Sequence, residues 1–202
     1  LTQGGGNSSV FNDSSIRYVN STLTYKLNDT YSPYVRLGVN DFRSITRIKY
    51  QNYLGGVIVE ASPKFSYDLS LGNTHFSSSG DNELIGGLTA KYLGGRYTLD
   101  GGFSRSVIPT DLGATELIDL LNLNYNYDLS ERSRWGLGVF LSENKSLLPN
   151  KTQQISASYA YDISRSWLMN LYLEARNIKF EGSDSVRNNT AGISFTYNTP
   201  NF

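Results

Sequence analysis

The chain has 202 residues, 39% of them hydrophobic, with a mean hydropathy of −0.36. It has no run of about 18 consecutive apolar residues, the length that a membrane-spanning helix requires. Eighteen basic and eighteen acidic residues cancel, which leaves no basic excess for binding nucleic acid. With no cysteine and a single histidine, disulfides are excluded and a metal centre is disfavoured. We therefore expect no metal, no cofactor and no nucleic-acid partner.

Apolar and polar residues alternate with a period of two along most of the chain. The segment 116–129 is a clear example: Leu121, Leu123 and Tyr125 alternate with Asn122, Asn124 and Asn126. A period of two predicts β-strands with one apolar and one polar face. Such strands with only middling average hydropathy are typical of a transmembrane β-barrel, in which lipid-facing and lumen-facing side chains alternate.

Eleven strands follow from this alternation. In chain order they span about residues 16–28, 33–41, 48–61, 64–74, 83–93, 96–106, 115–129, 134–143, 152–163, 166–177 and 189–198. The segment 50–61 is ambiguous, because Val57 to Val59 are apolar on both faces. We interpret it as a strand in which the Gly55–Gly56 pair marks a β-bulge.

Short and long connections alternate between these strands. The short ones fall at 28–33, 62–64, 94–96, 130–133 and 164–166. The long, polar ones fall at about 40–47, 74–83, 106–114, 143–152 and 178–189. Short periplasmic turns and longer outside loops are typical of outer-membrane barrels. The sequence therefore predicts a transmembrane antiparallel up-and-down β-barrel.

Aromatic residues recur beside the short turns. The stretch YDLSERSRWGLGVFL at 127–141 is echoed by YDISRSWLMNL at 161–171, each with a Tyr before the turn and a Trp after it. Aromatic belts lie at membrane interfaces. The predicted aromatic girdle consists of Tyr25, Tyr67, Tyr92, Tyr97, Tyr127, Trp135, Tyr161 and Trp167.

The polar face of the strands is rich in Asn, Ser, Thr, Gly and Asp. A soluble β-sandwich or barrel would also alternate, but it would fill its interior with large apolar side chains and use shorter strands. We therefore expect a water-filled lumen. The lumen-lining candidates are Lys26, Arg36, Asp68, Lys91, Asp100, Asn122, Asn124, Asn126, Glu174 and Arg176.

The strand count bears on the size of the barrel. Bacterial single-chain barrels have an even number of strands. The eleven strands therefore predict either about 12 strands, with a weak one near the start, or the C-terminal part of a larger barrel. We treat 1–202 as a single β-barrel domain, with 1–15 as an external loop or N-terminal segment. Phe202 is a terminal aromatic, but the alternating apolar set that ends at Tyr197 is out of step with it by one residue.

One histidine and its neighbouring serines raise the question of catalysis. His75 is followed by Ser77, Ser78 and Ser79, and a Ser/His pair can form a hydrolytic site. Because these serines are local and fall in a predicted loop, we interpret His75 as a solvated loop residue. We assign no catalytic residue. The Asn-x-Ser/Thr sequences at 144–146 and 150–152 match the N-glycosylation pattern, but in a bacterial barrel we interpret them as a result of the high Asn, Ser and Thr content.

Three segments carry a resemblance to a known group of proteins. YTLDGGFSRSVIP, YDLSERSRWGLGVFLSENKS and QQISASYAYDISRSWLMNLYLEARN resemble hairpins of bacterial outer-membrane β-barrel porins associated with exopolysaccharide gene clusters. The resemblance is best in the C-terminal half and carries over no site residue. It implies a role in polysaccharide export or a porin-like role.

We therefore expect a bacterial outer-membrane protein that is not an enzyme and forms a polar passage for export of a carbohydrate polymer. The first alternative is a general diffusion porin for small solutes, and the second is a lipid hydrolase at the barrel rim. The expected partners are outer-membrane lipid, sugar-type solutes or polymer, and periplasmic export or assembly proteins.

Overall fold

The computed structural model describes residues 15–43, 46–77, 79–109, 115–145 and 149–198. The strands are β1 (Ser15–Thr24), β2 (Tyr31–Arg43), β3 (Arg47–Ser62), β4 (Phe65–Phe76), β5 (Asn82–Leu93), β6 (Tyr97–Pro109), β7 (Thr115–Ser130), β8 (Ser133–Asn144), β9 (Asn150–Asp162), β10 (Trp167–Phe180) and β11 (Val186–Tyr197). In these described ranges there is no helix long and apolar enough to cross a membrane.

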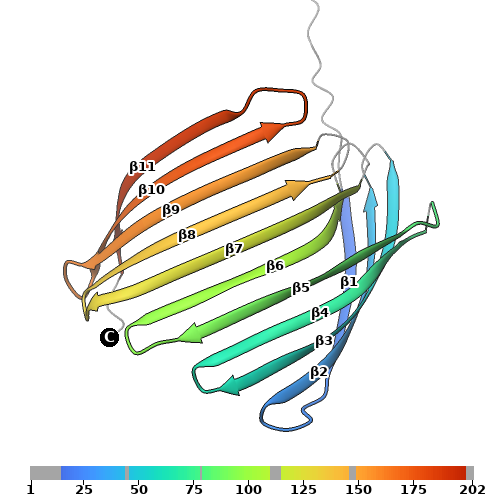
Figure 1. Ribbon diagram of the computed structural model, residues 1–202, viewed down its shortest axis with the longest axis horizontal. Helices are drawn as coiled ribbons and strands as arrows, with labels where there is room; N and C mark the ends of the chain where they lie inside the picture. The colour runs from blue at the N-terminus through green and yellow to red at the C-terminus, as the bar shows by residue number, and fades with distance from the viewer. Residues whose placement is uncertain (1–14, 44–45, 78, 110–114, 146–148, 199–202) are drawn as a thin grey trace, which may run out of the picture.

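All eleven strands form one antiparallel sheet, in which each strand pairs with its neighbours in sequence. The sheet is long-stranded and strongly curved, as Figure 1 shows. In the part of the chain that the structure describes, β1 pairs with β2 alone and β11 with β10 alone. The predicted up-and-down arrangement of eleven strands is therefore confirmed. The expectation for 1–15 falls almost wholly outside the described residues.

The strand register sorts side chains onto two faces. One row of paired residues runs Lys91, Asp100, Asn124, Gly138, Ser156 and Glu174 across β5 to β10. The adjacent positions carry large exposed apolar residues, such as Leu123 at 47% exposure and Leu137 at 46%. We call the polar side the inner face and the apolar side the outer face. An apolar face this exposed is typical of a sheet whose outer side meets lipid.

The strand boundaries differ from the sequence prediction in two respects. β3 has no bulge at Gly55–Gly56, where pairing with β4 is continuous, and the irregularity lies between Glu60 and Ser62. Gly56 instead leaves room for the ring of Tyr34, whose hydroxyl would lie 2.6 Å from a Cβ at this position. Several strands also run further into the long connections than predicted; β6, for example, reaches Pro109. The residues at these ends still pair with neighbouring strands, although they lie beyond the regular alternation from which the boundaries were predicted.

The β6–β7 hairpin leaves the wall of the sheet at its long-loop end. Pairing between β5 and β6 stops at Gly86 and Arg105, although β5 begins at Asn82. Beyond that point β6 pairs only with β7. Gly86 has a φ of 154°, and a side chain there would collide with the carbonyl oxygen of Ser70. Figure 1 shows this end of β6 and β7 running toward the ends of β1 and β2.

The separated part of the hairpin packs on the inner face of β2 to β4. Val107 contacts a buried cluster formed by Phe42, Ile48, Tyr50 and Phe76, which are 3–7% exposed. The rings of Tyr50 and Phe76 lie 5.9 Å apart. We call residues 106–109 and 115–118 the inward end of the hairpin. Val107 has outer-face register on β6, yet it contacts side chains on the inner face of β2 to β4. The inward end therefore forms a second layer inside the curved sheet.

Candidate functional site: the polar inner face

The structure brings nearly all predicted lumen-lining residues onto one surface. Arg36, Asp68, Lys91, Asp100, Asn122, Asn124, Asn126, Glu174 and Arg176 all lie on strands with inner-face register. Lys26 is the exception. It follows β1 in a turn, where its ammonium lies 2.8 Å from Asp29 Oδ1. The role of these residues as a lumen lining stays a prediction.

Hydrogen bonds order the polar side chains of β6 to β10. The Asn124 amide donates to Asp100 Oδ2 at 3.0 Å. Gln154 links two charges: its amide donates to Glu174 Oε2 at 3.0 Å, and its carbonyl oxygen accepts from Arg176 Nη2 at 2.9 Å. Glu174 and Arg176 also form a salt bridge of 3.2 Å. These contacts hold the side chains in place while leaving them accessible, because none of them is fully buried.

Three adjoining hollows follow this ordered surface. The largest, about 640 Å³, is lined by residues of β7 to β10, including Asn122, Gln154 and Arg176. A second, about 290 Å³, shares Asn122 with it and extends to Asp68 and Lys91. The third, about 190 Å³, shares Asn124 with the first and Asp100 with the second. The inner face therefore carries a continuous polar groove that runs across β4 to β10.

Two glycines on β8 set the depth of this groove. A Cβ at Gly136 would lie 2.7 Å from Asn126 Oδ1 and 2.9 Å from Ser158 Oγ. At Gly138 it would lie 2.6 Å from Ser156 Oγ. Because these distances are too short for a side chain, larger residues at either position would displace the neighbouring polar groups. Glycine at these positions keeps the amide row in contact with β9.

A second polar group lies on the inner face of β2 and β4. The Tyr34 hydroxyl donates to Asp68 Oδ1 at 2.9 Å. The guanidinium of Arg36 lies 5.5 Å from the centre of the Tyr34 ring, a cation–π geometry. Tyr34 therefore holds a carboxylate and a guanidinium, predicted separately from the sequence, on the same part of the wall.

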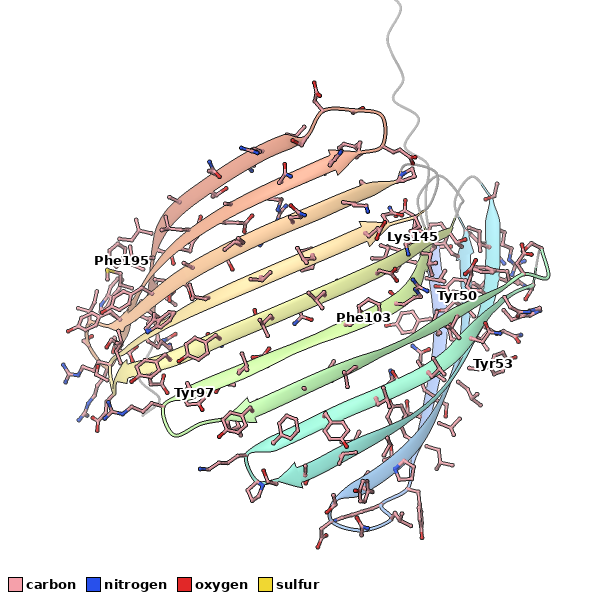
Figure 2. All side chains as sticks on the ribbon, in the orientation of Figure 1. Tyr50, Tyr53, Tyr97, Phe103, Lys145 and Phe195 are labelled. Atoms are coloured by element: carbon pink, nitrogen blue, oxygen red, sulfur yellow. The ribbon has the colours of Figure 1, made fainter. Side chains whose placement is uncertain are left out.

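Ionic contacts fix the root of the inward end. Arg105 donates through Nε to Asp119 Oδ1 at 2.5 Å and through Nη2 to Oδ2 at 2.6 Å. The Lys145 ammonium lies 2.8 Å from the same carboxylate, whose side chain is only 13% exposed. Nearby, the Asn144 amide donates to Glu116 Oε2 at 2.7 Å. Figure 2 shows Lys145 near the end of β8 and close to the hairpin root. These bonds join β6, β7 and β8 where β6 leaves β5.

The predicted aromatic girdle shares the outer face at the short-turn end of the sheet. Ring contacts join Tyr92 to Tyr97 at 5.7 Å, Tyr127 to Trp135 at 6.3 Å and Trp167 to Tyr197 at 5.2 Å. Tyr25, Tyr67 and Tyr161 occupy the same side and level. The structure therefore brings these aromatics together, and their anchoring in a membrane interface stays a prediction.

His75 lies on strand β4, and the sequence-based prediction of a loop position was wrong. The strand continues to Phe76, because His75 pairs with Gln51 and Asn82 on either side. Its Nδ1 lies 3.0 Å from Asn82 Oδ1 on the outer face. Ser77 and Ser79 lie beyond the end of the strand, and Ser78 lies outside the described residues. No hydrolytic arrangement is assembled among these described side chains.

Sequence reasoning missed the inward end and the contacts that hold it. The missed signal is a local failure of alternation, since Phe42, Ile48, Tyr50, Phe76 and Ile85 occupy inner-face positions that polar residues should fill. Large apolar groups at these places indicate that something covers them. Arg105 and Asp119, which interrupt the uncharged outer face of β6 and β7, mark the hairpin root in the same way.

No family model matches the sequence, and no curated protein matches it. Several solved structures match it in fold. A bacterial polysaccharide outer-membrane secretin superposes with a TM-score of 0.63 at 12% identity, over 89% of this chain and 63% of the secretin chain. The outer-membrane channel DcaP of Acinetobacter baumannii gives 0.61 at 14% identity, over 88% and 61%. OmpT, an outer-membrane protein of Vibrio cholerae, gives 0.59 at 11% identity, over 93% and 75%.

The chain spans less than two thirds of the length of the secretin and of DcaP. At these identities the likeness concerns the backbone arrangement rather than any site. It agrees with the single antiparallel sheet, the apolar outer face and the polar inner face described above. The chain therefore has the fold of outer-membrane β-barrels.

Proposed function

We propose that this protein resides in the bacterial outer membrane and forms a polar passage through which a carbohydrate polymer is exported. The observation that carries the proposal is the continuous polar groove of the inner face, with its ordered amides and paired charges. Amide and hydroxyl groups offer hydrogen bonds to sugar hydroxyls, and the half-buried ring of Phe140 in the same groove offers an apolar contact surface.

The charge pattern supports passage of a weakly charged solute. Glu174 and Arg176 neutralise each other, and Asp100 is bound by an amide. The groove thus carries many hydrogen-bonding groups and little excess charge of either sign, which suits a chain of neutral sugars that must bind weakly and move on. Two of the similar structures, a bacterial polysaccharide outer-membrane secretin and an outer-membrane channel, support the same class of function.

The competing function is a general diffusion porin for small solutes. The inward end of the β6–β7 hairpin bears on this choice, because a second layer on the inner wall narrows the space available for passage. If the protein exports a polymer, periplasmic export proteins act with the barrel, and the passage is restricted in their absence. A diffusion porin needs no partner and stays open.

Single-channel recording in planar bilayers separates the two functions. The export function predicts a closed or low-conductance barrel in the absence of partners. Where current flows, a neutral oligosaccharide should interrupt it with transient blockades. A large, steady conductance without partners favours the porin. Gln154→Ala removes a groove side chain and should shorten the blockades, whereas Ile155→Ala, on the outer face, serves as the matched control. Equal blockade times in both variants would contradict the role of the groove.

A further inference from the structure

A cluster of basic side chains lies on the outer face of β1 to β3, at the long-loop end. The register places Arg17 opposite Asp41 and Asp41 opposite Lys49, while Arg43 lies opposite Arg47. These positions share the face of Val19 and Val39, which are 71% and 54% exposed. We call Arg17, Arg43, Arg47 and Lys49 the basic patch. It therefore lies directly beyond the apolar surface that would meet lipid chains.

One carboxylate organises the patch without neutralising it. Asp41 accepts from Arg47 Nε at 2.8 Å and from Arg47 Nη2 at 2.5 Å, and the Arg43 guanidinium lies 3.9 Å away. Asp41 is the one acidic residue with outer-face register in the described parts of β1 to β4. Four positive charges and one negative charge leave an excess of three. Arg43 and Arg47 remain 50% and 46% exposed, so they are accessible to a ligand.

At the same level of the sheet on β6 to β9, the positive charges are nearly matched by carboxylates. There Asp119 binds both Arg105 and Lys145, and Glu143 binds Lys151 at 3.0 Å. Two carboxylates thus form ion pairs with three cations, which leaves an excess of one positive charge. The basic patch differs because its cations outnumber the available carboxylate by three.

We propose that the basic patch binds the phosphate groups of a lipid in the leaflet at the long-loop end. Arginine guanidinium groups bind phosphate oxygens through paired hydrogen bonds, and lysine adds a point charge. The neighbouring apolar positions, Val19, Val39 and Leu37, receive the acyl chains of the same molecule. A ligand with phosphate beside acyl chains fits both surfaces, whereas a free anion would use only the basic patch. The inference rests on the proposed membrane location and adds a lipid site on the outer wall.

The test is binding of lipid A, a bis-phosphorylated acylated disaccharide, to the full chain in neutral detergent, followed by native mass spectrometry. Dephosphorylated lipid A and inorganic phosphate are measured in parallel. The account predicts that lipid A binds at least about tenfold more tightly than its dephosphorylated form, and that high salt weakens the binding. Inorganic phosphate should compete only weakly, because it lacks the apolar half.

Variants locate the site. Arg43→Gln combined with Lys49→Gln should weaken lipid A binding about tenfold. Lys64→Gln combined with Arg165→Gln removes the same charge at the short-turn end and should leave binding unchanged. Equal binding of the two lipid forms by the wild-type protein would overturn the proposal, as would equal losses in the two variants. Full competition by inorganic phosphate would assign the patch to a free anion instead. Conductance of the wild-type protein is measured separately. Absence of lipid A binding by a wild-type protein with the expected conductance would overturn this inference alone.

Discussion

Two regions of the inner face differ in what covers them. On β2 to β4 the inner side chains Phe42, Tyr50 and Phe76 are apolar and buried beneath the inward end of the β6–β7 hairpin. On β7 to β10 the inner side chains Asn122 and Gln154 are polar and open to the groove. Both regions obey the same alternation and the same register. The difference shows that period two assigns a side chain to a face, whereas burial depends on a second layer.

Two inner-face phenylalanines give a large expected contrast. Phe76→Ala removes a ring from the buried cluster and should lower the free energy of unfolding by about 3 kcal/mol, because it leaves a cavity. Phe140→Ala removes a ring from the half-buried wall of the open groove and should cost about 1 kcal/mol. Urea unfolding followed by heat-modifiable gel mobility measures both. Equal losses would show that the inward end does not cover the cluster.

The two faces of β7 give the next contrast. Arginine in place of Leu123 would face lipid and should cost about 2 to 4 kcal/mol near the membrane midplane. Arginine in place of Asn124 would lie beside Asp100 in the groove and should be tolerated. The yield of folded, heat-modifiable barrel measures the effect. Efficient assembly of the Leu123→Arg variant would be inconsistent with a lipid-facing outer surface.

The root of the inward end can be loosened without touching the groove. Asp119→Asn weakens the contacts of both Arg105 and Lys145 at a carboxylate that is largely shielded, and should cost about 1 to 3 kcal/mol. Glu143→Gln weakens only an exposed pair with Lys151 and should cost less than about 1 kcal/mol. Denaturant midpoints of the two variants decide whether the root stabilises the hairpin. A smaller loss in Asp119→Asn than in Glu143→Gln would contradict that role.

The smallest expected effect on stability comes from the inward end itself, where two adjacent residues point in opposite directions. Val107 contacts the buried cluster, whereas Ile108 is 41% exposed. Val107→Ser should weaken the attachment of the inward end and widen the distribution of single-channel conductance. Ile108→Ser keeps the attachment and should resemble the wild type. Indistinguishable recordings from the two variants would show that the attachment does not affect the passage.

Much of the fold could be predicted from the sequence. Asn122, Asn124 and Asn126 alternate with Leu121, Leu123 and Tyr125, and this pattern assigned both strand and face without a partner being known. The girdle aromatics were equally visible, because each lies beside a short turn.

The inward end could not be predicted in this way. Its position depends on contacts between β6 and strands more than 30 residues away, such as that of Val107 with the buried cluster on β2 to β4. The basic patch was hidden for a similar reason. Arg17, Asp41 and Lys49 become neighbours only through the pairing of β1, β2 and β3. Likewise, the reason for a glycine at position 56 became visible only from its contact with the ring of Tyr34 on the neighbouring strand.

The central claim is that this sheet separates water on its inner face from lipid on its outer face. The most direct measurement uses single cysteines introduced at positions 121 to 126 of β7, in a chain that has no cysteine of its own. In a bilayer, cysteines replacing Asn122, Asn124 and Asn126 should react with a water-soluble maleimide. Fluorophores attached at Leu121, Leu123 and Tyr125 should be quenched by a lipid-borne probe. Absence of quenching at all three apolar positions would contradict the membrane barrel.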